Sequence, residues 1–375
     1  MVSWQEKLIT RLGPPISLCG VVFSDWWQAL RDNDFAIDSP YFFRAASMTL
    51  ASLVTSLQGW FEERIFGARI AKAEIRPPVF ILGHWRTGTT HLQYLLAADP
   101  RFACPNTYQV SYPHTFLITE AVGARLGGFL IPPKRPMDEV RISFQAPNED
   151  EFALCQMTLC SPYLGFTFPR RQSYYGQFLT LRGVSEAVKA RWKSAMVHFL
   201  KKLTWRYDRP LVLKSPPHTC RIKLLLDMFP NARFVHIHRN PYTVFQSTRH
   251  WLLSSGPWFH LQRPNDQSLE ERILRVYREM YDVFFEERPL IPAEQFHEVS
   301  FEELEKDSIG QLRNLYEAIN LPDFGQVEMT VQRYRNSLAG YKKNTFPTLD
   351  ADLQKRVARE WRQCFEEWGY ATTPP

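Results

Sequence analysis

The sequence has no cysteine pair spaced as a metal or redox motif. Its six cysteines are scattered along the chain, and none shows the C-x-x-C spacing of zinc ribbons or thioredoxin-like proteins. The first 20 residues carry Glu6, Lys7 and Arg11, and they lack the continuous apolar stretch of a secretory signal. These absences predict reduced thiols and a cytoplasmic protein.

Long apolar runs are also missing. No stretch of about 18 uncharged apolar residues occurs, which argues against a membrane-spanning helix. Residues 45–61 and 116–132 come closest, but the first contains Ser, Thr and Gln, and the second contains Glu120 and Arg125. We interpret both as buried or covering helices, and peripheral contact with a membrane is the alternative.

Neither sign of charge dominates the composition. The chain has 45 Lys and Arg against 39 Asp and Glu, a formal net charge of +6 over 375 residues. This small excess suits an anionic small molecule or a membrane surface, and no nucleic-acid partner is predicted from it. The 45% hydrophobic and 14% aromatic content is enough for a large core and excludes wholesale disorder.

Short apolar segments alternate with helical patterns from residue 76 onward. Each segment is expected to be a buried strand, and each is followed by apolar residues at helical spacing. The alternation indicates βαβ units and therefore predicts a P-loop-type, three-layer α/β/α fold with a central parallel sheet. The expected strands are 79–82, 211–213, 233–238 and 296–299, and the helices are expected to begin at Thr89, Arg221, Pro241 and Phe301.

Residues 1–75 are predicted to form a helical extension packed on a main domain of residues 76–375. The boundary coincides with Arg76-Pro77-Pro78, where two prolines end the helical pattern. Within the extension, apolar residues recur at helical spacing, and we interpret them as a stripe that faces the core. This stripe consists of Leu50, Leu53, Leu57 and Phe61.

A glycine-containing loop follows the first expected strand. Residues Gly83 to Thr90 read G-H-W-R-T-G-T-T. Such a loop directs backbone N–H groups at an anion, and the N-terminus of the following helix adds its positive dipole end. Against the pattern G-x-x-x-x-G-K-[ST], Thr89 stands in place of the lysine, and the cation is Arg86 instead. An ordinary ATPase is disfavoured, and a P-loop nucleotide kinase is kept as an alternative.

A second candidate anion site follows the third expected strand. Arg239 stands at the carboxyl end of that strand, where doubly wound sheets bind ligands. Ser247 lies eight residues later, inside the next helix. An arginine offers a planar pair of donors to phosphate, and a serine adds a hydroxyl. Two such sites on one sheet suit a nucleotide with phosphates at both ends.

Together the two motifs resemble those of the sulfotransferases that use 3′-phosphoadenosine 5′-phosphosulfate. The family loop [KR]-[ST]-G-T-[TS] corresponds to residues 86–90, and the resemblance covers roughly residues 76–250. It is strongest to the broad, mostly bacterial branch with an Arg-[ST]-Gly-Thr-Thr loop. The resemblance implies that the 5′-phosphosulfate is bound by Arg86, Thr87, Gly88, Thr89 and Thr90. It further implies that Arg239 and Ser247 bind the 3′-phosphate.

The resemblance also implies transfer without a metal ion. A sulfuryl group carries less negative charge than a phosphoryl group, so transfer depends on positioning and on cations that stabilise the leaving oxygen. We expect Arg86 to act in this way, together with Lys214, which matches the lysine of the family's Lys-Thr-His stretch. Lys342 and Lys343 resemble the late basic element that closes over the 3′-phosphate.

An acceptor hydroxyl needs a general base in the transition state. Glu149 and Asp150 are the carboxylate candidates, because they precede an apolar helical run. We interpret Glu151 as a capping residue, since Asn148 stands three residues before it. His218 is a further candidate base, and hydrogen bonding at a helix N-terminus is its alternative role.

The connections at about 100–175 and 250–270 are rich in aromatic residues, which favours an apolar or amphipathic acceptor. We therefore predict a sulfotransferase that acts on the hydroxyl or amine of a small molecule, lipid or glycan. The alternatives are a P-loop nucleotide kinase and a non-catalytic nucleotide-binding or membrane-associated scaffold. A scaffold would lack the general base.

Overall fold

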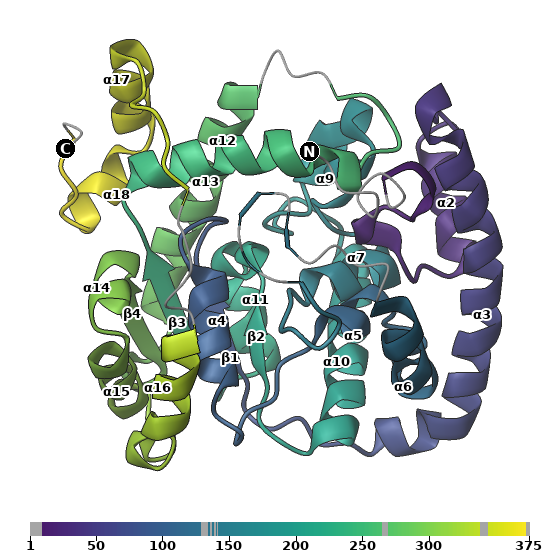
Figure 1. The fold of residues 1–375 in the computed structure, drawn as a ribbon, viewed down its shortest axis with the longest axis horizontal. Helices are drawn as coiled ribbons and strands as arrows, with labels where there is room; N and C mark the ends of the chain where they lie inside the picture. Colours follow the sequence, from purple (N-terminus) through teal and green to yellow (C-terminus); the bar gives the residue numbers. More distant parts are fainter. Residues whose placement is uncertain are drawn as a thin grey trace.

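A four-stranded, fully parallel sheet forms the centre of the computed structural model (Figure 1). The strand order is β2-β1-β3-β4, so the first strand lies between two strands that follow it much later in the sequence. The predicted strands are confirmed as β1 Val79–Leu82, β2 Val212–Lys214, β3 Arg233–His238 and β4 Phe296–Ser300. The structure describes residues 10–128, 134–135, 137–138, 140, 142–264, 269–337 and 344–372.

The sheet separates two hydrophobic cores, because successive side chains of a strand point to opposite faces. On β1, Phe80 and Leu82 join the larger core, whereas Val79 and Ile81 join the smaller one. Helices cover both faces, which confirms the predicted three-layer α/β/α architecture. The smaller core includes α4 Thr89–Ala97, α14 Phe301–Lys306, α15 Ser308–Ala318 and α16 Glu328–Ser337. The larger core includes α7 Glu151–Thr158, α10 Glu186–Tyr207, α11 Ile222–Met228, α12 Pro241–Ser255 and α13 Leu269–Glu287.

The helices that follow the strands begin close to their predicted positions. The helix expected from Phe301 is interrupted at Asp307, whose carboxylate accepts from the Gly310 N–H at 3.0 Å and starts a new helix there. The remaining helices connect the strands or cover the ends of the sheet. They are α5 Thr107–Ser111, α6 Phe116–Gly127, α8 Leu164–Thr167, α9 Gln172–Gly176, α17 Ala351–Glu360 and α18 Arg362–Glu367.

Two N-terminal helices, α2 Phe23–Asp32 and α3 Phe42–Ala71, lie along one side of the molecule, at the right of Figure 1. Trp26 and Met48 from these helices belong to the same core as Phe80. Arg44, in the first turn of α3, is fully buried and donates to five backbone carbonyls. The N-terminal region is therefore joined to the sheet region by both apolar and polar contacts.

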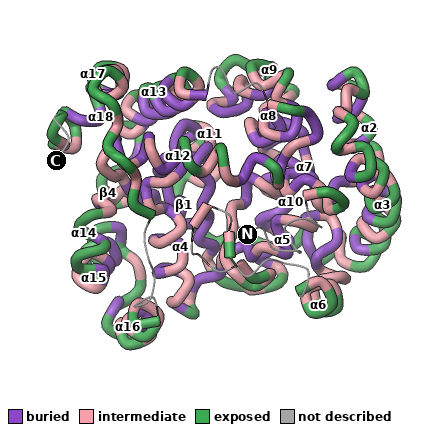
Figure 2. Tube along the Cα trace, turned by 45° about the horizontal axis from the view of Figure 1, so that its top comes forward, coloured by how far each residue is buried: buried purple, intermediate pink, exposed green. Residues whose placement is uncertain are grey.

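The predicted core-facing stripe on α3 is wrong. Leu50, Leu53 and Leu57 are 69%, 49% and 59% exposed, and Phe61 is 46% exposed. Helical spacing shows that these residues share one face, but it does not say what covers that face. The buried residues of α3 are instead Arg44, Met48, Ser52, Thr55, Glu62 and Ile70, most of which are polar. Figure 2 shows the exposed outer side of α3 at the margin of the molecule.

Among the described residues, no helix combines the length and the apolar character needed to cross a bilayer.

Candidate functional site

The loop between β1 and α4 depends on two glycines with positive φ. Gly83 has φ 143°, and a Cβ there would lie 2.6 Å from the Ile237 carbonyl oxygen. Gly88 has φ 103° at the N-cap of α4, and its Cβ would lie 2.3 Å from the Phe301 ring. Any larger residue would widen the loop, so the tight turn requires glycine at both positions.

Arg86 lies at the outer turn of this loop and has a left-handed backbone, with φ 72°. Such a conformation is costly for a residue with a side chain, so the surrounding contacts must hold Arg86 in it. Its Nε donates to Ser247 Oγ at 2.9 Å, and both terminal nitrogens donate to Asp138 Oδ2 at 3.2 Å. The loop thus presents a guanidinium group beside helix α12.

Arg239 follows β3 directly and lies close to the same loop. Its NH1 donates to the Arg86 carbonyl oxygen at 3.4 Å, and its guanidinium carbon lies 4.3 Å from the centre of the Phe301 ring. The preceding β-strand and the N-cap of α12 fix this position, since the Asn240 side chain accepts from the Tyr242 N–H at 3.0 Å. The structure therefore brings Arg86, Arg239 and Ser247 together at the carboxyl edge of β1 and β3.

Asp138 was not identified from the sequence, yet its carboxylate lies among these cations. It accepts from Arg86 and, at 2.7 Å, from Arg135 NH2. Burial acts to raise the pKa of Asp138, but the two arginines outweigh burial and hold that pKa below its usual value. Asp138 lies in a connection between the strands and helices predicted from the sequence, where no periodicity or motif spacing identifies a functional residue.

Lys214 and Glu149 form an ion pair next to the loop. Lys214 ends β2, and its Nζ lies 2.6 Å from Glu149 Oε1 and 3.5 Å from Thr90 Oγ1. Burial lowers the pKa of Lys214, and the Glu149 carboxylate opposes this shift. The Glu149 side chain keeps 16% of its surface exposed, so its carboxylate is not sealed in the protein.

Two aromatic residues that the sequence did not indicate support this pair. The Tyr163 hydroxyl donates to the other oxygen of Glu149, and Trp85 Nε1 donates to the Tyr163 hydroxyl at 3.2 Å. Trp85 belongs to the glycine loop itself. Glu149 is therefore held between a cation and a phenol, beside the candidate anion site.

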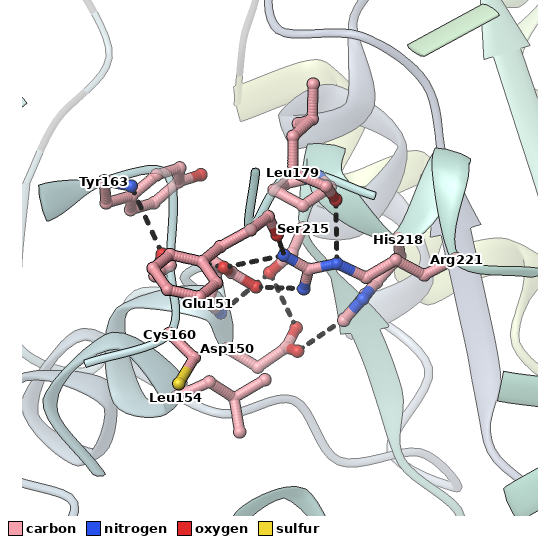
Figure 3. Close-up of polar contacts among 12 residues, drawn as sticks. Asp150, Glu151, Leu154, Cys160, Tyr163, Leu179, Ser215, His218 and Arg221 are labelled. Atoms are coloured by element: carbon pink, nitrogen blue, oxygen red, sulfur yellow. Dashed lines mark hydrogen bonds and ion pairs between the residues drawn. The ribbon is translucent and has the colours of Figure 1, made fainter. Parts of the chain in front are cut away.

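Asp150, the next residue, belongs instead to a group of buried polar side chains with Ser215 and His218 (Figure 3). It is 1% exposed and accepts from Ser215 Oγ at 3.0 Å, while His218 Nε2 lies 2.6 Å from its other oxygen. Burial acts to raise the pKa of Asp150, but His218 and Ser215 hold that pKa below its usual value. His218 has no exposed surface, so the Asp150–His218 pair is enclosed in the protein, whereas Glu149 is partly exposed.

The interpretation of Glu151 as a capping residue is wrong. Its carboxylate pairs with Arg221 at 2.7 Å and accepts from Ser161 Oγ at 2.7 Å, and both charged side chains are completely buried (Figure 3). The Glu151 N–H donates to Ser215 Oγ at 2.9 Å, so the start of α7 is satisfied by the residue after β2 rather than by Asn148. The partner lies 70 residues away in the sequence, which no local pattern reveals.

The threonines of the loop have different environments. Thr87 is completely buried, and its hydroxyl donates to the His84 carbonyl oxygen at 2.8 Å within the turn. Thr89 and Thr90 form the first turn of α4. Lys342 and Lys343 lie outside the described residues, and the next residue, Asn344, donates to the Met137 carbonyl oxygen at 2.7 Å.

In the part of the chain that the structure describes, no group of three or more His, Cys, Asp or Glu side chains is arranged to hold a metal ion.

A cavity of about 280 Å³ lies between residues 165–172 on one side and residues 251–264, Leu269 and Arg272 on the other. Phe166, Trp251, Leu252 and Phe259 supply much of its apolar lining. Trp251 stacks on Trp85 of the glycine loop, with ring centres 6.1 Å apart. The ring centre of Phe166 lies 5.9 Å from that of Tyr163, which donates a hydrogen bond to Glu149. Aromatic ring contacts therefore connect the cavity lining, through Tyr163, to the Lys214–Glu149 pair.

Comparisons with known proteins agree with the motifs. Residues 77–325 match the model of the sulfotransferase family. The chain is 36% identical over 357 residues to the omega-hydroxy-beta-dihydromenaquinone-9 sulfotransferase Stf3 of Mycobacterium tuberculosis and to that of Mycobacterium bovis. The alignment covers 95% of this chain and 92% of each relative.

Solved structures share the fold. The sulfotransferase STF9 from Mycobacterium avium superposes with a TM-score of 0.67 at 20% identity, over 92% of this chain and 96% of that one. The sulfotransferase STF1 from Mycobacterium tuberculosis gives a TM-score of 0.62 at 16% identity, over 90% and 92% of the two chains.

Proposed function

Because the chain belongs to the sulfotransferase family, we propose that it moves a sulfuryl group from 3′-phosphoadenosine 5′-phosphosulfate to a hydroxyl group of a lipid acceptor. The enzyme class follows from the family and from the curated relatives. The donor, the acceptor class and the roles of individual residues are the proposal.

The convergence of Arg86, Arg239 and Ser247 on one sheet edge is the observation that carries the choice of donor. A nucleotide with phosphates at both ends needs two cationic groups within the span of one small molecule. The backbone N–H groups at the start of α4 lie in the same loop as Arg86 and are suited to bind an anion. These residues fit a 3′,5′-bisphosphorylated nucleoside, with the 5′ group over the loop.

Glu149 is the general base in this proposal. The acceptor O–H bond breaks as the new O–S bond forms, the proton moves to Glu149, and the bond from sulfur to the bridging phosphate oxygen breaks. Lys214, which lies 2.6 Å from Glu149 and 3.5 Å from Thr90, is placed to stabilise charge on the leaving oxygen. Asp150 and His218 are not assigned to the reaction, because both are buried in a separate network.

The aromatic cavity supports a lipid as the acceptor. Its Phe, Trp and Leu lining suits an apolar chain, and the lining residues Trp251 and Phe166 pack on Trp85 and Tyr163, the rings next to Glu149. The curated relatives act on a hydroxylated menaquinone, a lipid with a polyprenyl tail. We therefore propose that this cavity receives the acceptor's apolar part, and that the Trp85 and Tyr163 rings shift to let its hydroxyl reach Glu149.

Thermal stability tests the proposed donor. Ligand that binds only the folded state raises the apparent stability by about 2.7 kcal/mol at 100 times its Kd. We expect 3′-phosphoadenosine 5′-phosphate to raise the melting temperature of the wild type, and the Arg239→Ala variant to lose most of this shift. Stabilisation by MgATP alone would instead support the nucleotide-kinase alternative.

Turnover tests the proposed base and acceptor. The assay follows labelled sulfate from the donor to an omega-hydroxylated polyprenyl quinone in detergent. Glu149→Gln keeps the size of the side chain but removes its basicity, so we expect kcat to fall by about 10²–10⁴-fold while nucleotide binding persists. The matched control is Glu294→Gln, an exposed carboxylate in a short helix before β4, which should leave kcat unchanged. Full activity of Glu149→Gln would refute the assignment.

A further inference from the structure

The outer face of α3 has a composition opposite to that of an ordinary surface helix. Between Phe42 and Phe61, every residue classed as exposed is apolar. These residues are Phe42, Phe43, Ala46, Leu50, Ala51, Leu53, Val54, Leu57, Trp60 and Phe61. Monomeric soluble proteins rarely expose a continuous apolar patch of this kind unless it contacts something.

The inner face of the same helix is polar where it meets the protein. Arg44 is buried on backbone carbonyls, and Glu62 is buried against Lys202 Nζ, which also donates to the Pro113 carbonyl oxygen. Thr49 and Ser56 accept hydrogen bonds from α2. These specific contacts fix the rotation of α3, so the apolar residues cannot turn inward without breaking them.

Helix α6 lies beside α3 and also exposes apolar residues. Its Ile118 N–H donates to Glu62 Oε2 at 3.2 Å, which ties α6 to α3. Val122 and Leu126 of α6 are 60% and 65% exposed. Helices α3 and α6, which contain most of the two segments that come closest to apolar runs in the sequence, therefore lie side by side, and both expose apolar residues.

We propose that this apolar face of α3 and α6 docks on the surface of a lipid bilayer that contains anionic lipids. The face offers almost no side-chain hydrogen-bonding groups, since Trp60 is its only exposed residue with a polar atom between Phe42 and Phe61. A protein interface of useful size carries about ten hydrogen bonds, whereas the acyl region of a bilayer needs none. The chemistry of the face therefore suits lipid better than a protein partner.

The distribution of aromatic and basic residues agrees with this occupant. Phe42 and Phe43 lie at one end of the face, and Trp60 and Phe61 at the other, as in segments that lie at the level of the lipid headgroups. Arg64 packs over the Trp60 ring at 5.2 Å. The exposed charged residues from 62 to 72 are Glu63, Arg64, Arg69 and Lys72, a sum of +3 − 1 = +2 that complements anionic headgroups.

The docking face is also linked to the proposed acceptor cavity. Arg44 lies in the first turn of α3, and it donates to the Pro257 and His260 carbonyl oxygens at 2.9 and 3.1 Å. Both of these residues line the cavity. The choice of a bilayer as occupant rests in part on the proposed lipid acceptor, whereas the apolar face itself does not. Docking through α3 would hold the cavity wall close to the membrane from which a lipid acceptor comes.

Cosedimentation with vesicles tests the proposal without using activity. The vesicles are phosphatidylcholine mixed with phosphatidylglycerol, and pure phosphatidylcholine vesicles serve for comparison. We expect the wild type to sediment with the mixed vesicles. The partition coefficient of Leu53→Glu/Leu57→Glu should be lower by about tenfold or more. The matched control is Leu290→Glu/Met329→Glu, which alters exposed apolar residues outside the face. It should bind as the wild type does.

Three outcomes would overturn the proposal. The wild type could remain in the supernatant, or the α3 variant could bind as strongly as the wild type. Alternatively, analytical ultracentrifugation without lipid could show a dimer that the α3 substitutions dissociate, which would make a second copy the occupant. Melting curves check that each variant is folded. Nucleotide-induced stabilisation, measured in parallel, separates failure of the proposed function from failure of docking.

Discussion

Replacing Glu151 with glutamine distinguishes the sequence interpretation of this residue from the structural finding. A capping glutamate interacts weakly with the first turn of its helix, and glutamine replaces it well in a capping box. In the structure, however, Glu151 neutralises Arg221, and neither side chain has any exposed surface. The Glu151→Gln substitution would leave the guanidinium of Arg221 buried without a counter-ion.

The size of the effect follows from that burial. Loss of one partner from a buried ion pair costs about 3–5 kcal/mol, whereas loss of a helix cap costs about 1 kcal/mol. Arg221 would keep its hydrogen bonds to the Leu179 and Phe178 carbonyl oxygens, at 2.9 and 2.6 Å. These bonds hold the guanidinium in place but do not neutralise it, so we expect a loss near 3 kcal/mol.

The assay is equilibrium unfolding in urea, supported by melting curves. An unfolding entropy of about 2.1 cal/mol/K per residue gives roughly 0.8 kcal/mol/K for 375 residues. A loss of about 3 kcal/mol therefore lowers the melting temperature by about 4 °C. Glu294→Gln, the exposed control, should change it by less than about 1 °C.

The double variant Glu151→Gln/Arg221→Met provides the decisive comparison. Removing both charges leaves no unpaired ion, so it should recover part of the stability lost by Glu151→Gln alone. A loss of about 1 kcal/mol or less in Glu151→Gln, with no recovery in the double variant, would refute the buried-pair reasoning and restore the capping interpretation.

Two further predictions concern the pH dependence of stability and the anion site. Burial acts to raise the pKa of Glu298, but the hydrogen bond to His236 at 2.7 Å holds that pKa at about 2, below the usual 4.5. This pair therefore stabilises the fold above about pH 4.5, and the contribution is lost as the pH falls toward 2. The free energy of unfolding in urea should differ between the wild type and Glu298→Gln by about 3 kcal/mol at most above pH 4.5. The difference should shrink as the pH falls from 4.5 toward 2. Asp138→Asn should increase the thermal stabilisation by 3′-phosphoadenosine 5′-phosphate, because a carboxylate paired with Arg86 at 3.2 Å competes with a bound phosphate for it. A smaller shift than in the wild type would mean that Asp138 positions Arg86 rather than competing with the ligand.

Local patterns were sufficient to predict the sheet and the loop. The apolar runs that became β1 and β3 are buried on both faces, so they needed no knowledge of their neighbours to be identified as strands. The glycine loop and Arg239 follow these strands directly, and parallel strands end at one edge. The sequence therefore also indicated which residues would meet there.

The direction of neighbouring side chains could not be predicted in the same way. Glu149 and Asp150 are adjacent in the sequence, yet one lies beside the glycine loop and the other is buried with His218. Their directions depend on partners 65 and 68 residues away. Asp138 escaped prediction for a similar reason, since only its contact with Arg86 distinguishes it from any other loop carboxylate.

The sequence by itself determined the alternation of strands and helices, because side-chain periodicity and glycine conformations are properties of the local chain. It also determined that Leu50, Leu53 and Leu57 share a helix face. Only the tertiary structure decided that this face points outward, because the buried contacts of Arg44 and Glu62 fix the rotation of α3. Periodicity identifies a common face, whereas the surrounding chain decides whether protein or solvent meets it.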